Sequence, residues 1–186
     1  MTSEHSIALH EHEEARAGRP SVRRLTGRGL GLFAGTALAV VALDQATKAA
    51  VRAWLERGEH WPSPGDGLLH ISRVENSGAA FGILQGAGPF LLVTTALGVV
   101  AILAYLLFAP PAGRLYTAAL ASVLGGAVGN LVDRAARGTV TDFIDPIHYP
   151  AFNIADSAIV IGVGTLILLS FFDPSREAAG SGQEGR

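Results

Sequence analysis

Residues 115–134 read LYTAALASVLGGAVGNLVDR, a long apolar run that ends in a cluster of polar side chains. Three other runs with almost no charge cover residues 30–51, 88–108 and 154–172. A helix needs about 20 apolar residues to cross the hydrocarbon core of a bilayer, and each run is close to that length. The sequence therefore predicts an all-α membrane protein with four transmembrane helices.

Two other interpretations of these runs are less favoured. A soluble helical bundle would show polar residues at helical spacing, which the runs lack. A cleaved signal peptide would be shorter than the first run, and a small-residue cleavage pattern would follow it. The chain has no cysteine, which excludes disulfides, thiol catalysis and thiolate metal sites. Its net charge of −2 indicates no particular partner, and nothing in the sequence predicts nucleic-acid binding.

Basic residues before the first run indicate how the helices are oriented. Residues 1–28 are polar, lack apolar periodicity and are expected to form a disordered tail. Cytoplasmic segments next to membrane helices are rich in arginine and lysine, so this tail is expected in the cytoplasm. Its arginines are Arg16, Arg19, Arg23, Arg24 and Arg28. Four spans, within a domain covering residues 29–173, then return a second tail (174–186) to the cytoplasm.

The connection between the first and second spans, residues 54–88, contains a predicted strand. Residues 68–76 read LLHISRVEN and partly alternate between apolar and polar side chains, which is typical of a strand. Trp54 and Trp61 suit the interface between membrane and water, where tryptophan is enriched. We therefore expect a small β-containing element on the outer, extracytoplasmic surface of the membrane.

With this topology, the polar residues that need an explanation all lie on the outer side of the membrane. They are Asp44, Lys48, Asn76, Asn130, Asp133, Arg134, Asp142, Asn153 and Asp156. Ionisable groups at the edge of a hydrocarbon layer are costly and by default mark a functional site. Residues placed by chance would not gather on one side, so the sequence predicts a single site.

Asp142 and Asp156 are the candidates for a catalytic pair, in which two neighbouring carboxyls share a proton and activate water. Asp156 also has a structural explanation, because Asn153 and Asp156 have the spacing of a capping box. Asp142 follows a β-prone run and precedes apolar residues, and this setting is expected to raise its pKa. Asp145 is the rival, although an Asp-Pro pair is typical of a turn. The sequence leaves open which carboxyl of the pair carries the proton.

The other polar residues have structural interpretations as well. Asp44 and Lys48 stand four residues apart and share a helical face, which favours an ion pair. Asp133 and Arg134 are expected to close the third helix and to pair with acids of the loops. The glycines of residues 125–129 form a small-residue face that lets helices pack closely.

Five segments resemble, in this order, the signature blocks of the lipoprotein signal peptidases (signal peptidase II), a family of bacterial membrane aspartic proteases. They are DQATK (44–48), NSGAAFG (76–82), GGAVGNLVDR (125–134), GTVTDF (138–143) and PAFNIAD (150–156). One block alone is a weak signal. Five blocks in register, on four spans and across nearly all of the chain between the tails, are highly specific.

The resemblance implies an activity and residue roles. Asp142 and Asp156 would be the catalytic pair. The supporting residues would be Asn130, Asp133, Arg134, Asn153, Asn76, Asp44 and Lys48. The substrates would be prolipoproteins whose lipobox cysteine carries diacylglycerol, cut before that cysteine at the outer face of the bacterial cytoplasmic membrane. Membrane lipid would be a further partner and globomycin an inhibitor, and no metal or organic cofactor would be needed.

Other functions are compatible with a polar cluster in a membrane protein. A proton-coupled transporter or channel subunit would use the acids as a relay, but such acids usually lie at the midplane of the bilayer. A non-enzymatic scaffold would tolerate Asp142→Asn. A Ser-His-Asp triad finds no serine in a suitable turn. A zinc site is weakly supported, because His148 lacks a partner at ligand spacing. The histidines His5, His10 and His12 could bind a metal but are better explained by a solvated tail.

Overall fold

The computed structural model describes residues 26–62, 67–78, 86–109, 111 and 113–172. Within these residues the elements are α2 (Gly27–Trp54), β1 (His60–Trp61), β2 (Leu69–Asn76), α3 (Gly88–Phe108), α4 (Arg114–Arg137), β3 (Val140–Pro146) and α5 (Ile154–Phe171). All four helices are long and apolar enough to cross a membrane, so the four predicted spans are confirmed. The predicted tails lie outside the described residues, except that α2 already begins at Gly27, inside the interval assigned to the first tail.

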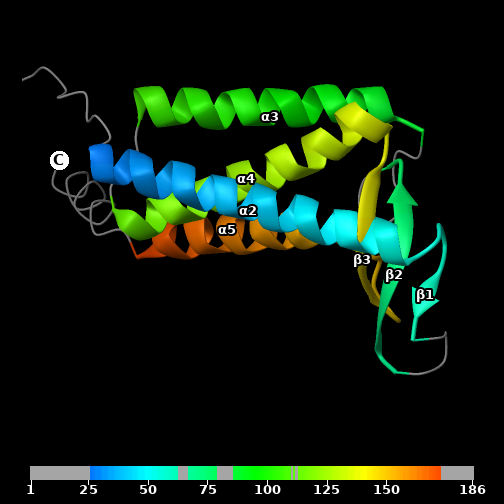
Figure 1. Cartoon of the computed structure of the whole chain (residues 1–186). Helices are drawn as coiled ribbons and strands as arrows, with labels where there is room; N and C mark the ends of the chain where they lie inside the picture. Colours follow the sequence, from blue (N-terminus) through cyan, green and yellow to red (C-terminus); the bar gives the residue numbers. More distant parts are fainter. Residues whose placement is uncertain (1–25, 63–66, 79–85, 110, 112, 173–186) are drawn as a thin grey trace, which may run out of the picture.

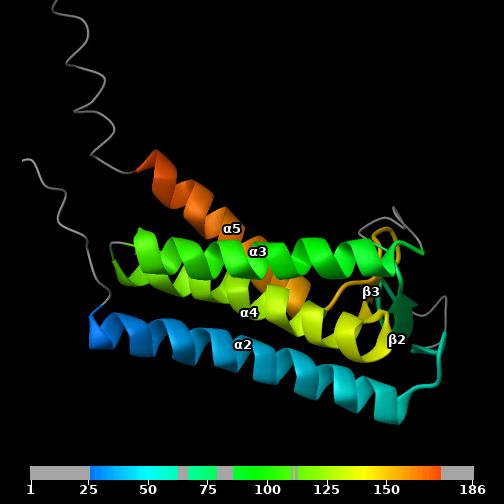
Figure 2. The same ribbon diagram turned by 90° about the horizontal axis from the view of Figure 1, so that it is seen from above.

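The helices run side by side, and the strands lie at one end of them (Figure 1). The start of α2 and the end of α5 both lie at the opposite end (Figure 2). α4 is the central helix, because it contacts α2, α3 and α5 and half of its apolar window is buried, against 11–17% in the other three. The other helices therefore present most of their apolar side chains outward, as membrane-spanning helices do.

Glycines let α4 approach both α2 and α5 closely. A Cβ on Gly125 would lie 2.8 Å from a carbonyl oxygen of α2, and a Cβ on Gly129 would lie 2.6 Å from Asp44 Oδ2. A Cβ on Gly126 would collide with the carbonyl oxygen of Ala155 on α5. The predicted small-residue face is confirmed. It brings the backbones of three helices close enough for the polar side chains at their ends to meet.

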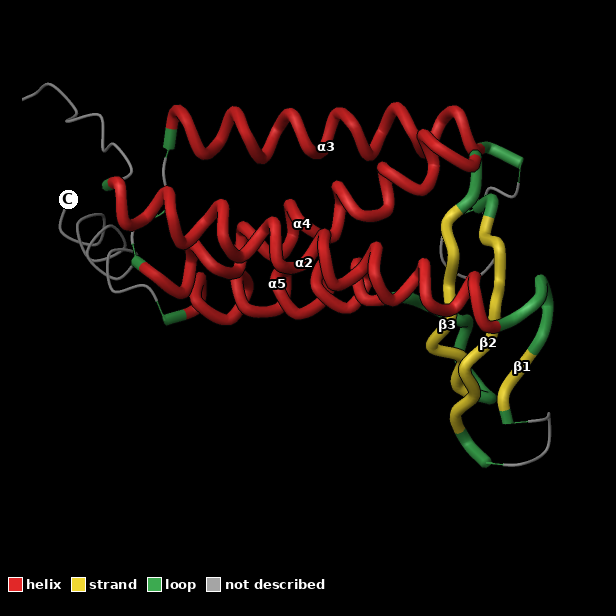
Figure 3. The backbone as a smooth tube through the Cα atoms, viewed as in Figure 1, coloured by secondary structure: helices red, strands yellow, loops and turns green. Residues whose placement is uncertain are grey.

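The three strands form one antiparallel sheet in the order β1-β2-β3 (Figure 3). β2 agrees with the strand predicted at residues 68–76. Its partner β3 comes from the connection between α4 and α5, where the sequence indicated an extended run but no pairing. A strand needs a neighbour for its backbone N–H and C=O groups, and a segment distant in sequence supplies it here. The register pairs Val74 with Asp142, so it sets Asp142 opposite β2.

α4 continues beyond the predicted end of the third span. It runs to Arg137, and Gly138 caps it with φ 75°, a left-handed conformation that glycine adopts at low cost. The expectation that Asp133 and Arg134 close this helix is therefore wrong. The physical reason is that cations of α2 and α4 surround the Asp133 carboxylate, so the helix can carry this charge without ending there.

Candidate active site

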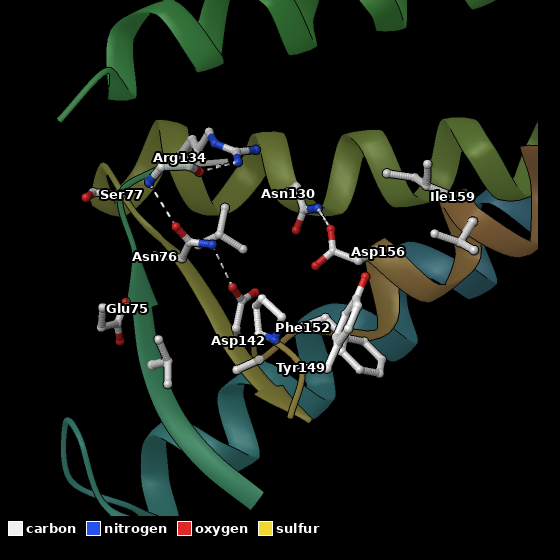
Figure 4. A pocket seen from close by; sticks show the side chains of 16 residues that line it. Glu75, Asn76, Ser77, Asn130, Arg134, Asp142, Tyr149, Phe152, Asp156 and Ile159 are labelled. Atoms are coloured by element: carbon white, nitrogen blue, oxygen red, sulfur yellow. Dashed lines mark hydrogen bonds between the residues drawn. The ribbon is translucent and has the colours of Figure 1, made fainter. Parts of the chain in front are cut away.

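The polar residues that the sequence singled out come together at the sheet end of the bundle. Asn130 and Arg134 project from α4, Asn76 from the end of β2, Asp142 from β3 and Asp156 from the first turn of α5 (Figure 4). All five line one pocket with a volume of about 570 Å³. Two carboxyl groups, one from a strand and one from a helix, therefore face the same space.

Asp142 is held by two amide side chains. Asn76 Nδ2 donates a hydrogen bond to Asp142 Oδ2 at 2.9 Å, and Asn153 Nδ2 donates to Asp142 Oδ1 at 2.7 Å. Asp142 is only 2% exposed. Burial raises the pKa of Asp142 to about 7; the negative charge of Asp156 acts in the same direction, and the two amide hydrogen bonds oppose it. The predicted rise is confirmed, so the carboxyl holds a proton in a large fraction of molecules at neutral pH.

Asp156 caps its own helix and also faces the pocket. The predicted capping box is confirmed: the Asp156 N–H donates to Asn153 Oδ1 at 2.9 Å, and the Asn153 N–H donates to Asp156 Oδ2 at 3.3 Å. The second carboxylate oxygen, Oδ1, accepts from Asn130 Nδ2 at 2.7 Å. These contacts fix the orientation of the carboxylate at the pocket, so a capping role and a chemical role coexist in one residue.

Asn153 connects the two carboxyl groups. It is fully buried, and its Nδ2 donates to both Asp142 Oδ1 and Asn130 Oδ1, the latter at 3.2 Å. Its Oδ1 accepts from the backbone of Asp156. Both N–H groups and the oxygen of this amide are therefore in use. A rotation of the side chain would break a contact to one of the two aspartates, so Asn153 sets their relative position.

Lys48, the only lysine of the sequence, lies behind Asn130. Its Nζ is 2.9 Å from Asp44 Oδ2, 3.3 Å from Asp133 Oδ2 and 3.0 Å from Asn130 Oδ1. Lys48, Asp44 and Asp133 are fully buried. The predicted Asp44–Lys48 ion pair is confirmed, and Asp133 joins it. Because the oxygen of Asn130 faces the ammonium group, its nitrogen is turned toward Asp156.

Asp133 fastens β3 to the helices. Arg137 Nη1 lies 2.8 Å from Asp133 Oδ1, and Arg52 Nη1 lies 3.7 Å from the same oxygen. The Thr141 N–H donates to Asp133 Oδ2 at 3.2 Å, and Arg52 donates to Thr141 Oγ1 at 3.0 Å. These contacts hold Thr141 in place, and Thr141 directly precedes Asp142 in β3. Arg52 and Thr141 were not predicted as site residues, although Arg52 stands four residues after Lys48 and so shares its helical face.

The pocket joins the carboxyl groups to the apolar surface of α5. Residues 149–152 form one wall, and Ile159 and Val160 continue the lining along α5 (Figure 4). Val160 is 70% exposed and faces outward from the bundle. Arg134 also lines the pocket, and its Nη2 lies 3.5 Å from the carbonyl oxygen of Gly78; within the described residues it forms no ion pair with a loop acid, contrary to expectation. The pocket is thus polar next to the sheet and apolar along a membrane-spanning helix.

This chain is similar to known proteins over most of its length. The family model described as "Signal peptidase (SPase) II" matches residues 36–172. The lipoprotein signal peptidase of Brevibacillus brevis is 45% identical over 139 residues, which cover 74% of this chain and 93% of that protein. The lipoprotein signal peptidase of Shouchella clausii is 48% identical over 134 residues, which cover 71% of this chain and 87% of that protein.

A solved structure has the same fold. It is a bacterial membrane enzyme determined by the in meso method at 2.3 Å, and it superposes with a TM-score of 0.71 at 30% sequence identity, covering 85% of this chain and 96% of that chain. The matched family segment takes in all of the residues that line the pocket. The chain belongs to the signal peptidase II family, and it is a multi-pass bacterial membrane peptidase.

Proposed function

We propose that this peptidase removes signal peptides from prolipoproteins whose lipobox cysteine already carries diacylglycerol, and that it cuts just before that cysteine. Membership of the family supports prolipoproteins as the substrates. The observation that carries the chemical part of the proposal is the pair Asp142 and Asp156, which line one pocket and are joined through Asn153. Two acids with a shared proton are the arrangement with which aspartic proteases activate water.

In the proposed reaction a water molecule lies between the two carboxyl groups. Ionised Asp156 accepts a proton from the water as its oxygen attacks the scissile carbonyl carbon, and protonated Asp142 donates to the carbonyl oxygen. When the C–N bond breaks, the leaving amine takes the proton from Asp156, and a hydroxyl of the intermediate returns one to Asp142. The raised pKa of Asp142 supports this distribution of the shared proton.

The shape of the pocket supports a substrate that is anchored in the membrane. Ile159 and Val160 extend the lining along α5, and Val160 lies on the outward side of that helix, where lipid would surround it. The diacylglycerol chains would stay in the bilayer while the peptide bond reaches the carboxyl groups. Binding energy from these remote chains would position the bond for attack. The same pocket is the expected site for the cyclic peptide globomycin.

The orientation of the chain in the membrane is part of the proposal. The start of α2 and the end of α5 lie at the end of the bundle opposite the sheet (Figure 1). The arginines that precede α2 favour the cytoplasm for that end. The tails 1–28 and 174–186 would then be cytoplasmic on either side of a peptidase domain at 29–173, with the active site at the outer face.

Proton-coupled transport is the second candidate, and the charge distribution favours it less. Within the described residues, the buried charged side chains are Asp44, Lys48, Asp133 and Asp142, all in the half of the bundle next to the sheet. A proton path would need polar groups that continue toward the other end of the helices. Charges gathered at one edge fit chemistry at the membrane surface better than passage through the membrane.

Cleavage is expected to depend on the lipid of the substrate. In nanodiscs the protein should cut a diacylglyceryl-modified precursor with a kcat/KM at least about 100-fold above that for the unmodified sequence, because anchoring positions the peptide bond. A precursor with a short alkyl group on the cysteine sulfur is the control, since it changes the sulfur without adding an anchor. Equal rates for all three peptides, measured by mass spectrometry, would contradict the anchoring step.

The rate is also expected to fall as the pH rises above about 7. The protonated fraction of Asp142 decreases about tenfold per pH unit above its pKa of about 7, and the reaction uses that proton. Asn76→Ala removes a hydrogen bond that lowers this pKa, so it should move the falling limb of kcat/KM to higher pH. A profile that is flat up to about pH 9, or a limb that Asn76→Ala moves to lower pH, would contradict Asp142 as the proton donor.

A further inference from the structure

The end of the sheet farthest from Asp142 exposes large apolar side chains. Leu68 is 80% exposed, Leu69 54%, Trp61 57% and Ile147 45%. Backbone contacts hold three of them together, since the Ile147 N–H donates to the Leu68 carbonyl oxygen at 3.2 Å and Leu69 is the next residue of β2. We call these four residues the apolar tip. An exposed apolar cluster of this kind marks a surface for a protein or membrane partner.

The two faces of the sheet next to the apolar tip differ in polarity. Trp61 pairs with Ile71 in the β1–β2 register, and Leu69 precedes Ile71 by two residues, so these three side chains project from one face. On the opposite face His70 pairs with Asp145. His70 is buried, so Trp61 and Leu69 are the side chains that this end of the sheet exposes.

The depth of the apolar tip follows from its contact with the end of α2. Trp54 is the last residue of α2, a helix of membrane-spanning length. The ring centroids of Trp54 and Trp61 are 5.5 Å apart, so the tip begins at the level of the sheet-side end of α2. Figure 1 shows the strands crossing the helix ends and projecting beyond the bundle on one side, where β2 begins. The sheet end that carries the tip therefore projects sideways past the helices, over the space that lipid would fill.

We infer that the apolar tip inserts into the interfacial layer of the membrane on the active-site side and anchors the sheet there. Tryptophan rings favour this layer, and the neighbouring aliphatic side chains gain burial in it. Apolar surface continues from the outward side of α2 through Trp54 to the tip, so one partner, lipid, covers both. The anchor holds the far end of β3 at the interface and thereby sets the depth of Asp142 in the membrane.

The two tryptophans of the chain make this inference measurable. They are Trp54 and Trp61, so Trp54→Phe and Trp61→Phe each leave one fluorophore. Each full-length variant is placed, one copy per nanodisc, in phosphatidylcholine brominated at shallow or at deep acyl positions. Trp61 should lose at least about half of its emission to shallow bromines and less to deep ones, as should Trp54.

Three substitutions test the residues of the apolar tip. Leu68→Ser, Leu69→Ser and Ile147→Ser, added together to the Trp54→Phe chain, should reduce the quenching of Trp61 at least about twofold. The same three changes in the Trp61→Phe chain should leave the quenching of Trp54 unchanged, which verifies that the bundle is intact.

Three outcomes would overturn the inference. The first is Trp61 emission that does not respond to bromine at either depth. The second is Trp61 quenching that the three serine substitutions leave unchanged while Trp54 behaves as expected. The third is Trp61 emission that lipid bromines do not quench in discs with one copy and that is shielded from water only in discs with two copies, which would assign the surface to contact between copies.

Discussion

Asp142→Asn and Asp156→Asn are each expected to lower kcat/KM for a diacylglyceryl-modified precursor by about 10²–10⁴-fold or more. An amide can neither accept the proton of the attacking water nor donate one to the carbonyl oxygen, and proton transfer of this kind contributes about that factor. The two carboxyl groups act on one water as a unit, so the double variant should be little slower than either single one. Cleavage by purified protein in nanodiscs measures all three.

Asp145→Asn is the matched control for this pair. Asp145 lies on the same strand as Asp142, but its carboxylate faces His60 Nδ1 at 3.2 Å and does not line the pocket. Its kcat/KM should stay within about twofold of wild type, the range expected of a change outside the catalytic machinery. Near-normal activity of a folded Asp142→Asn or Asp156→Asn protein would show that this residue is structural and would contradict the mechanism.

Lys48→Met is expected to lower the free energy of unfolding by about 3–5 kcal/mol, the usual loss when one partner of a buried ion pair is removed. The side chain is fully buried and its ammonium group lies between two fully buried carboxylates, Asp44 and Asp133. Methionine fills the space but leaves Asp44 without its cation, while Asp133 keeps only Arg137 and the more distant Arg52. Reversible unfolding in mixed micelles, with increasing fractions of denaturing detergent, measures the loss.

A double-mutant cycle separates the ion pair from packing. Asp44→Asn combined with Lys48→Met should recover part of the stability lost in Lys48→Met, because one uncompensated charge is then absent. A loss below about 1 kcal/mol in Lys48→Met would mean that the carboxylates are neutralised in another way. Activity should fall as well, since Lys48 orients Asn130, which donates to Asp156.

Several features of the fold and site could be predicted because their signals are local. The four spans follow from the length of the apolar runs alone. The ion pair of Asp44 and Lys48 follows from a spacing of one helical turn, and the capping box of Asn153 and Asp156 follows from a spacing of three. Segregation of the polar residues to one end needed only the order of the spans along the chain.

The site residues that the sequence did not predict depend on contacts between separate segments of the chain. Tyr149 and Phe152 line the pocket from a connecting segment with no periodicity, so the sequence does not show which way they point. Thr141 joins the network because its backbone N–H reaches Asp133, a contact that depends on where β3 lies. The end of α4 was placed too early, because the compensation of Asp133 by Arg52 and Lys48 involves a different helix.

Local chemistry in the chain thus accounts for four membrane helices, a strand after the first of them, and a set of polar residues at one end that includes two aspartates. Packing accounts for the geometry of that set. Glycines of α4 let three helices meet, pairing of β2 with β3 sets Asp142 beside Asn76, and Asn153 holds both carboxyl groups at one pocket. These contacts join residues far apart in the chain, and their distances depend on how helices and strands pack, which spacing within a single element does not encode.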